Sequence, residues 1–435
     1  MLSKPEREQI IALIKREVVP AIGCTEPIAI AYAGAKVREV LGQMPEHLEV
    51  GCSGNIVKNV KAVTVPNSGG QRGIQAAAAM GVIGGDASQE LAMLEAVKPA
   101  DIEKCKALLK TDFVDCNLVE NVANLYIDIK ATAGEHSAEV EIQDYHSNIT
   151  KIVKDDQVLL NRDNAAGKEA APVGPDKSLL NVKDILEFAD TVDLKEVQDV
   201  LERQIEYNTA ISEEGLKHPY GAEIGRTLME DFDTSKVEVQ AKALAAAGSD
   251  ARMSGCPMPV VINSGSGNQG ITVTMPVVVY AKYYHIPQEK LYRALIVSNL
   301  ISIHQKRYIG SLSAYCGATS AACGSGAGIA YMMGMNYEEI SEVITNSIAT
   351  IGGMACDGAK SSCAAKIAAA VECATVAIHM ARKKRAFKSG EGLVKDNVEE
   401  TIAAIGDMGR VGMKSTDVEI LNIMLDKIKP LENKN

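Results

Sequence analysis

The spacing of apolar and polar residues changes partway along the chain. In the first part, segments with helical spacing alternate with segments in which every second residue is apolar, most clearly at 124–144 on both sides of a Gly-containing turn. From about residue 181 onward, helical spacing dominates. The pattern predicts an α+β protein, in which a mixed part of helices and antiparallel strands precedes a mostly α-helical part.

Local signals predict where the first two helices begin. Ser3 and Glu6 have the spacing of a capping box, and apolar residues then recur at helical spacing up to Val18. In the second helix, Thr25 is the expected N-cap. This places Cys24 at a helix N-terminus.

Two shorter segments, 48–53 and 149–155, have the residue types of further strands. The stretch 161–178 concentrates Asn, Gly, Pro and charged residues between periodic segments, which is typical of a boundary. We therefore expect a first domain over residues 1–172, which carries the Cys24 segment, and a mostly helical second domain over residues 173–435.

Composition narrows the class of partner and compartment. The 45 basic and 56 acidic residues give a net charge of −11, which argues against nucleic-acid and membrane-surface partners. The chain starts without the apolar core of a signal peptide, and no run of about 18 uncharged apolar residues occurs. We expect a cytoplasmic protein, in which the ten cysteines stay reduced.

Four of these cysteines form two pairs with equal internal spacing, Cys316 with Cys323 and Cys356 with Cys363. A spacing of seven residues puts both members on one helix face, where cysteine packs as a small hydrophobe. Zinc is disfavoured because the close C-x2-4-C spacing is absent and no histidine lies between the pairs. Iron–sulfur ligation tolerates looser spacing and remains the competing interpretation.

The surroundings of Cys363 suit an iron–sulfur site. Two serines precede it at the expected start of a long helix, where free backbone N–H groups stabilise a thiolate. Lys360 and Lys366 add positive charge. Asp357 and Lys360 have no further role that the sequence assigns.

Two other segments carry candidate chemistry. A thiol at a helix N-terminus has a lowered pKa, so Cys24 is either a base or nucleophile, or a buried small residue in a helix-entry turn. The stretch NSGSGNQG, 263–270, is rich in N–H donors that can cradle a carboxylate or phosphate, although a plain turn has the same composition. It resembles the Ser-Gly-Asn loop of pyridoxal-phosphate-dependent dehydratases, but no Schiff-base lysine context accompanies it.

Four segments together, AIGCTEPIAIA, NSGSGNQG, SAYCGATSAACG and GGMACDGAKSSCAAK, resemble the L-cysteine desulfidase family, which is related to the α-chain of iron–sulfur-dependent L-serine dehydratase. The resemblance extends over nearly the whole chain, in family order. It implies an oxygen-sensitive 4Fe-4S cluster with one open iron site, held by Cys316, Cys356 and Cys363. Cys323 is then a bystander.

The resemblance also implies the reaction and its residues. Cys24 matches the proposed base that removes the Cα proton, while the open iron acts on the leaving group. We expect substrate contacts from Thr25, Glu26 and Asn55, and from the loop residues Ser264, Gly265, Ser266, Gly267 and Asn268. The products from L-cysteine are pyruvate, ammonia and sulfide.

Three alternatives stay open at this point. An L-serine dehydratase would use the same mechanism, although the related serine enzymes carry a Ser-Ser-His-Thr-x-Gly-Pro stretch where this chain has Cys-Thr-Glu-Pro. A pyridoxal-phosphate enzyme would perform the same class of elimination. A redox or structural iron–sulfur protein would use all four paired cysteines. The expected partner is a small amino acid, and a homo-oligomer is compatible with the sequence.

Overall fold

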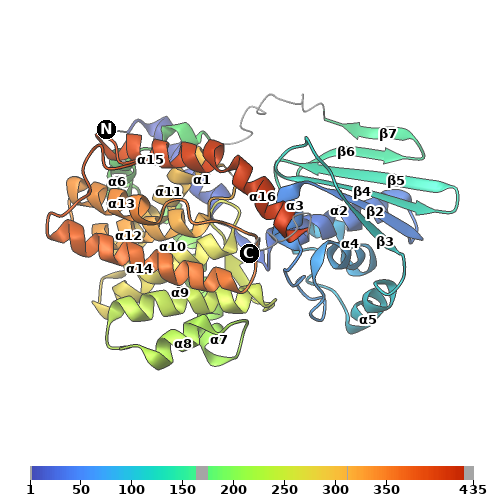
Figure 1. Ribbon diagram of the computed structural model, residues 1–435, viewed down its shortest axis with the longest axis horizontal. Coiled ribbons are helices and arrows are strands. Elements are labelled where there is room, and N and C mark those ends of the chain that lie inside the picture. The colour runs from blue at the N-terminus through green and yellow to red at the C-terminus, as the bar shows by residue number, and fades with distance from the viewer. Residues whose placement is uncertain (1, 163–174, 311, 426–435) are drawn as a thin grey trace, which may run out of the picture.

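The computed structural model describes residues 2–162, 175–310 and 312–425, and it confirms the α+β class. A sheet with its helices forms one part, and a larger helical bundle forms the other (Figure 1). The elements up to residue 161 are α1 (Lys4–Glu17), β1 (Pro20–Ile22), α2 (Thr25–Leu41), β2 (His47–Cys52), α3 (Gly54–Val60), α4 (Gly73–Gly84), η1 (Ala87–Ala92), α5 (Pro99–Leu108), β3 (Val114–Leu118), β4 (Tyr126–Ala133), β5 (His136–Gln143), β6 (Ile149–Lys154) and β7 (Gln157–Asn161). The later elements are η2 (Lys177–Leu179), α6 (Val182–Thr191), η3 (Leu194–Glu196), α7 (Gln198–Lys217), α8 (Ile224–Asp231), α9 (Val237–Met253), β8 (Pro259–Val261), α10 (Gly267–Tyr283), α11 (Gln288–Ile309), α12 (Gly317–Met332), α13 (Tyr337–Ile351), α14 (Ser362–Arg382), α15 (Val398–Asp407), η4 (Met408–Gly412) and α16 (Lys414–Met424).

The larger sheet has six strands in the order β3-β2-β4-β5-β6-β7. Only β2 and β3 run parallel, and the other neighbours are antiparallel. The alternating segment predicted as a hairpin forms β4 and β5, and the two shorter predicted strands form β2 and β6. Buried and exposed residues alternate along β4 and β5, so one face of the sheet packs against α2. Helix α2 in turn packs against α4.

The helix starts agree with the local signals, with one correction. Ser3 caps α1, and a complete capping box with Glu6 is present. Thr25 was the expected N-cap of α2, but Cys24 occupies the N-cap position, and Thr25 is the first helical residue. The Thr25 hydroxyl instead donates a hydrogen bond to the Gly265 carbonyl at 3.1 Å, so it serves a contact with another part of the chain.

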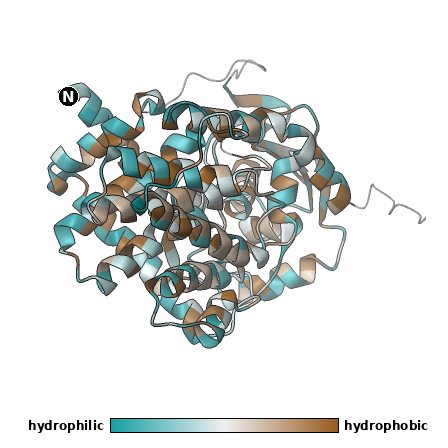
Figure 2. Ribbon diagram, turned by 60° about the vertical axis from the view of Figure 1, so that its left-hand side comes forward, coloured by the Kyte–Doolittle hydropathy of each residue, from teal (hydrophilic) through white to brown (hydrophobic). Residues whose placement is uncertain are grey.

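Buried apolar residues form two large clusters. One lies between the sheet, α2 and α4, and the other fills the helical bundle. Helix α1 packs into the second cluster through Ile10, Leu13 and Ile14, although it comes first in the sequence. Figure 2 shows hydrophilic residues on the outward faces of many of the helices. The expected boundary at 172/173 lies outside the described residues, so the two-domain division stays a prediction.

Small residues allow the helices to approach closely. A Cβ at Gly81 of α4 would lie 2.0 Å from the carbonyl oxygen of Ala31 in α2. Only glycine permits this contact, which brings the two helix backbones together beneath the sheet. Few residues of the chain are aromatic. Close approach of the helix backbones fills the space that large side chains would otherwise occupy.

A short two-stranded sheet links the two parts. Strand β1 pairs antiparallel with β8, with Pro20 opposite Val261 and Ile22 opposite Pro259. Strand β1 leads into Cys24, and β8 leads into the loop at 263–270. Segments about 240 residues apart in sequence, including the Thr25 and Gly265 pair, are thereby held side by side.

Among the described residues, α14 is the one helix whose length and apolarity match a membrane span. Its residues Ile367, Val371 and Ala374 are part of the main buried cluster, and α14 packs against α9, α12 and α13. These contacts are those of a core helix, so length and composition alone are weak evidence for a span.

Candidate active site

The structure brings Cys316, Cys356 and Cys363 together from three segments. Cys316 is the N-cap of α12, Cys356 lies in the loop before α14, and Cys363 is the second residue of α14. The Cys316 amide donates to the Met354 carbonyl at 2.9 Å, and the Cys356 amide donates to the Ala314 carbonyl at 2.6 Å. This short backbone pairing sets the first two thiols beside each other.

The three thiols form one electrostatically coupled group. The Cys316 thiol donates a hydrogen bond to the Cys356 sulfur, and this bond lowers the pKa of Cys356 to about 6 against the opposing effect of burial. The charges of Lys58 and Lys366 act in the same direction as the bond. The same bond, together with burial, raises the pKa of Cys316. Cys363 also acts on the pKa of Cys316, so all three sulfurs lie within interaction range.

Cationic side chains surround this group. Lys58 of α3 and Lys306 of α11 are buried, with exposed fractions of 2% and 6%. Burial lowers the pKa of Lys306 to about 8, whereas the Cys356 and Cys316 thiols act to raise it. Lys58 forms an ion pair with Asp417 of α16, the helix that crosses between the two parts of the molecule (Figure 1). Buried positive charge of this kind stabilises thiolates and other anions.

Asp357 and Lys360, which had no role assigned from the sequence, brace the loop of Cys356. The Asp357 carboxylate pairs with Lys360 at 2.6 Å and with Lys366 of α14. Burial alone would raise the pKa of Asp357, but the hydrogen bonds from these two lysines lower it to about 2. Lys366 also donates to the Ala355 carbonyl at 2.7 Å. The loop is thereby fixed to the first turns of the helix that carries Cys363.

Gly358 brings this loop against α3. Its φ is +93°, and a Cβ there would lie 2.1 Å from the carbonyl oxygen of Lys58. Glycine is required both by the backbone conformation and by the approach of the two backbones. The contact joins the loop between Cys356 and Cys363 to the first part of the chain.

Cys24 lies next to the third of these cysteines. Its side chain is 3% exposed and packs in a small cluster with Val63 and Met253, against which Cys363 also packs. The sequence predicted a lowered pKa at this helix N-terminus, but burial raises the pKa of the Cys24 thiol to about 12. The Arg252 guanidinium opposes this effect through its charge and a hydrogen bond. The effect of desolvation on the pKa of Cys24 therefore outweighs that of the helix N-terminus.

Arg252, at the end of α9, was not identified from the sequence. Its side chain is 5% exposed, donates to the Gly23 carbonyl at 2.8 Å and donates to the Asn268 side-chain oxygen at 3.1 Å. A Cβ at Gly267 would lie 2.3 Å from Arg252 Nε, so this glycine makes room for the guanidinium. Arg252 therefore joins the Cys24 segment to the loop at 263–270. No carboxylate of the described residues forms an ion pair with it.

The loop at 263–270 lies at the start of α10, with several of its polar groups already engaged. Ser266 is the N-cap of α10, and Asn268 accepts the bond from Arg252. Ser264 and Gly265 have positive φ values of 50° and 79°, which form a tight turn. The Ser264 hydroxyl donates to its neighbour Asn263 at 3.1 Å. The loop is thus a rigid turn beside Thr25 rather than a free Gly/Ser segment.

Helix α3 carries two asparagines one helical turn apart, and one of them contacts the start of α2. Asn59 donates to the Glu26 carboxylate at 3.4 Å, and Glu26 also accepts a bond from the Thr25 hydroxyl at 3.2 Å. Asn55, one turn earlier on α3, has a buried side-chain oxygen without a hydrogen-bond partner among the described residues. The predicted residues Thr25, Glu26 and Asn55 therefore come from two neighbouring helix starts.

Two buried polar atoms near Cys316, Gln269 Oε1 and Ser320 Oγ, also have no hydrogen-bond partner within the described ranges. A Cβ at Gly317 would lie 2.6 Å from the Gln269 side chain, so Gln269 lies directly on the start of α12. Because buried polar groups are almost always hydrogen-bonded, water or a bound group is expected to supply these partners.

The three thiols and the groups around them are of the type that holds a thiolate-bound cluster. Over residues 2–162, 175–310 and 312–425, no group of three or more His, Cys, Asp or Glu side chains could hold one metal ion. In an iron–sulfur cluster the cysteines bind different irons, and the surrounding N–H groups and cations compensate its charge. Cys316 and Cys363 lie at helix N-termini, and the buried Lys58 and Lys306 interact with Cys356 and Cys316.

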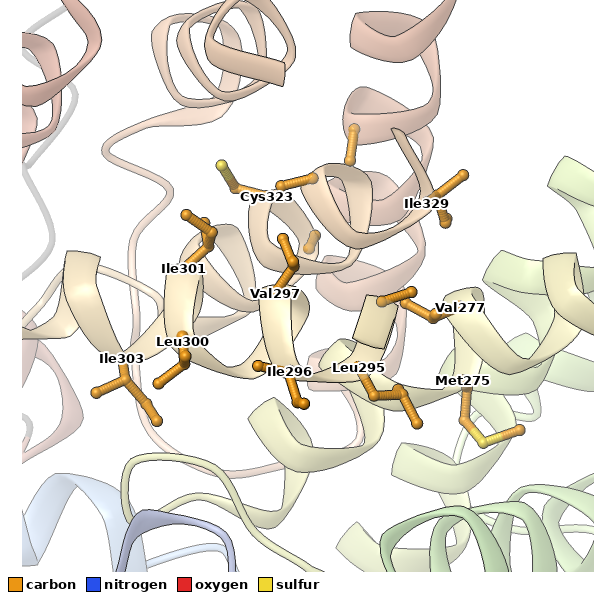
Figure 3. Packing of buried hydrophobic residues seen from close by; sticks show 14 of the residues in the cluster. Met275, Val277, Leu295, Ile296, Val297, Leu300, Ile301, Ile303, Cys323 and Ile329 are labelled. Atoms are coloured by element: carbon orange, nitrogen blue, oxygen red, sulfur yellow. The ribbon is translucent and has the colours of Figure 1, made fainter. Parts of the chain in front are cut away.

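Cys323 lies apart from this group. It is fully buried in α12 within the main apolar cluster, which includes Val297 and Ile301 of α11, and its sulfur points away from these two residues (Figure 3). Its thiol donates to the Ile344 carbonyl at 3.9 Å, and burial raises its pKa to about 12. Cys323 and Cys316, which form one of the two equally spaced pairs in the sequence, therefore have different surroundings.

Comparison with known proteins gives the family. A model of the family described as serine dehydratase alpha chain matches residues 88–422. A UPF0597 protein of Lachnoclostridium phytofermentans is 49% identical over 419 residues, covering 96% of this chain and 100% of the relative. A UPF0597 protein of Finegoldia magna is 49% identical, covering 95% and 99%, and one of Treponema denticola is 44% identical, covering 98% and 99%. The family match includes Cys316, Cys356 and Cys363 but begins after Cys24. The chain belongs to the serine dehydratase alpha chain family.

Proposed function

We propose that this protein is an iron–sulfur-dependent lyase that converts L-cysteine to pyruvate, ammonia and sulfide. The observation that carries the proposal is the convergence of Cys316, Cys356 and Cys363, with Cys24 packed against the last of them. These three thiols would hold a 4Fe-4S cluster with one open iron. When bound, the cluster would supply a Lewis acid for the leaving group of the substrate.

The protein's own residues would bind the amino acid and move its protons. Cys24 would accept the Cα proton, which requires its thiolate. A raised pKa makes that thiolate a stronger base but a rarer species, so the Arg252 charge is needed to stabilise it. The buried surroundings exclude water, which strengthens these electrostatic interactions.

The loop at 263–270 would orient the substrate. Its turn is fixed by Thr25 through Gly265 and by Arg252 through Asn268. A rigid frame reduces the entropy that substrate binding must remove, which can contribute several kcal/mol to lowering the barrier. Substitutions that loosen this frame should therefore lower the rate more than they weaken binding.

L-Serine is the second candidate substrate, and the family name favours it. The same residues would then release water in place of sulfide. L-Cysteine is preferred here because the segment at 24–27 reads Cys-Thr-Glu-Pro, where the related serine enzymes carry a Ser-Ser-His-Thr-x-Gly-Pro stretch. We further propose a cytoplasmic location, which suits an oxygen-sensitive cluster.

The test is anaerobic reconstitution with iron and sulfide, followed by measurement of pyruvate released from L-cysteine and L-serine. Wild type should release pyruvate, with L-cysteine as the better substrate. Cys24→Ala should keep the cluster absorbance and lose activity by about 100-fold or more. Cys105→Ala is the matched control, since Cys105 is equally buried but belongs to the sheet part.

Two outcomes would overturn the proposal, and a third would exclude the role given to Cys24. Absence of pyruvate from both amino acids, with the cluster intact, would exclude the lyase. Activity that depends on added pyridoxal phosphate and is lost on borohydride treatment would favour the pyridoxal-phosphate alternative. Activity of Cys24→Ala equal to that of Cys105→Ala would exclude Cys24 as the base.

A further inference from the structure

The hairpin turn between β5 and β6 carries a histidine to the candidate site. The turn is closed by bonds from the Asn148 side chain to the Gln143 carbonyl at 2.9 Å and from the Asp144 amide to the Leu125 carbonyl at 3.0 Å. Outside it, Tyr145 stacks under the Arg16 guanidinium of α1 at 5.4 Å. The hairpin tip is therefore anchored to both parts of the molecule, with His146 held between these contacts.

His146 points at the turn that faces Thr25. A Cβ at Gly265 would lie 3.8 Å from His146 Cε1, and the Gly265 carbonyl accepts the Thr25 hydroxyl. The Glu26 carboxylate acts on the imidazole through its charge. His146 thus completes a corner whose other walls are the start of α2 and the loop at 263–270.

One ring atom in this corner lacks a partner. His146 Nε2 is buried and has no hydrogen bond to any described residue. The buried Asn55 side-chain oxygen on α3 is also without a partner in the described ranges. Glu26, which Asn59 of the same helix orients, adds a carboxylate. These three groups share a chemical character, because each can accept a hydrogen bond.

We propose that His146 Nε2 and the Glu26 carboxylate form the binding subsite for a primary ammonium group, that of the α-amino acid substrate. This assignment rests on the proposed lyase function for the identity of the substrate, but the subsite is defined by its own residues. An ammonium has three N–H donors and no acceptor, so it can donate both to the unpartnered His146 Nε2 and to the Glu26 carboxylate.

The state of the imidazole agrees with this assignment. Burial lowers the pKa of His146, although Glu26 opposes the effect, so the neutral ring with a free Nε2 lone pair is favoured. A neutral imidazole accepts from an ammonium, whereas an imidazolium would repel it. The half-buried Glu26 carboxylate supplies the compensating charge that an ammonium in this corner needs.

The test compares two non-reacting ligands that differ only in the group concerned. L-Alanine carries the ammonium and L-lactate carries a hydroxyl in its place, and both retain the carboxylate and methyl group. Binding of each is measured by calorimetry on the anaerobically reconstituted protein. Wild type should bind L-alanine at least tenfold more tightly than L-lactate.

The variants assign the preference to His146. His146→Leu should weaken L-alanine binding by about tenfold or more and change L-lactate binding by less than about twofold. His146→Gln, which keeps an acceptor, should restore most of the L-alanine affinity. His136→Leu is the control, since His136 lies at the opposite end of strand β5. Thermal unfolding of each variant shows whether the fold is retained.

The subsite is excluded if His146→Leu weakens the binding of both ligands equally or the binding of neither. It is also excluded if wild type shows no preference for L-alanine over L-lactate. The lyase proposal fails separately, when wild type releases no pyruvate from L-cysteine or L-serine. If the protein releases pyruvate but His146→Leu does not change L-alanine binding, the lyase proposal holds and the ammonium subsite is refuted. If the preference for L-alanine depends on His146 but no pyruvate is released, the ammonium subsite holds and the lyase proposal is refuted.

Discussion

Replacing Gly358 by alanine should move the loop between Cys356 and Cys363 away from helix α3. At φ +93°, a Cβ costs about 1–2 kcal/mol in backbone strain. The same Cβ would lie 2.1 Å from the Lys58 carbonyl, a backbone atom that cannot rotate away, which adds about 1–3 kcal/mol of overpacking. The total is about 2–5 kcal/mol, and much of it should be relieved by moving the loop between Cys356 and Cys363.

The matched control for this substitution is Gly390→Ala. Gly390 has a similar φ of +88°, but nothing lies within 4 Å of its Cβ position. Alanine at this position therefore adds backbone strain without overpacking. Both variants are compared by the free energy of unfolding and by iron bound after anaerobic reconstitution. We expect Gly358→Ala to lose most of its iron while Gly390→Ala binds as much as wild type. Equal iron content and equal unfolding free energies would refute the role given to this contact.

Three further predictions concern single side chains. Arg252→Gln should lower the rate of pyruvate release by about 100-fold with a smaller change in KM, and Arg252→Lys should recover part of it, in steady-state assays. Lys366→Met removes the bonds to Asp357 and Ala355, so a chelator should extract iron several-fold faster than from wild type. Burial raises the pKa of Asp128 to about 7 from an ordinary value of 3.8, so the folded protein holds a proton that the unfolded chain has lost between those pH values. The unfolding free energy should therefore fall as the pH rises toward about 7, and Asp128→Asn should remove about 2–4 kcal/mol of this dependence in urea titrations at several pH values. Unchanged rates, unchanged iron loss, or parallel pH profiles would contradict these three expectations in turn.

Local patterns were sufficient where neighbouring residues decide the structure. The capping box of Ser3 and Glu6 and the alternation in β4 and β5 predict their elements because the interactions concerned are short in sequence. The packing of α1 against the C-terminal helices was not predicted, because it depends on contacts between segments more than 150 residues apart. Spacing alone also could not distinguish Cys323 from Cys316, since both lie in or at the start of the same helix.

Two side chains of the candidate site were missed for a physical reason. Arg252 ends an Ala-rich helix, where a basic residue is usually solvated and favourable to the helix dipole. His146 lies in a polar hairpin turn, which normally faces water. Both are placed at the site because β1 pairs with β8 and the hairpin docks near α1. Their position at the site is a property of the tertiary fold, and the sequence around them carries no signal of it.

The most direct test of the account is the iron content of cysteine variants after anaerobic reconstitution. Wild type and Cys323→Ala should each bind about four iron atoms per chain, whereas Cys316→Ser, Cys356→Ser and Cys363→Ser should each lose most of them. Loss of iron in Cys323→Ala equal to that in the other three would contradict the three-thiol site. It would favour instead a cluster closed by all four paired cysteines.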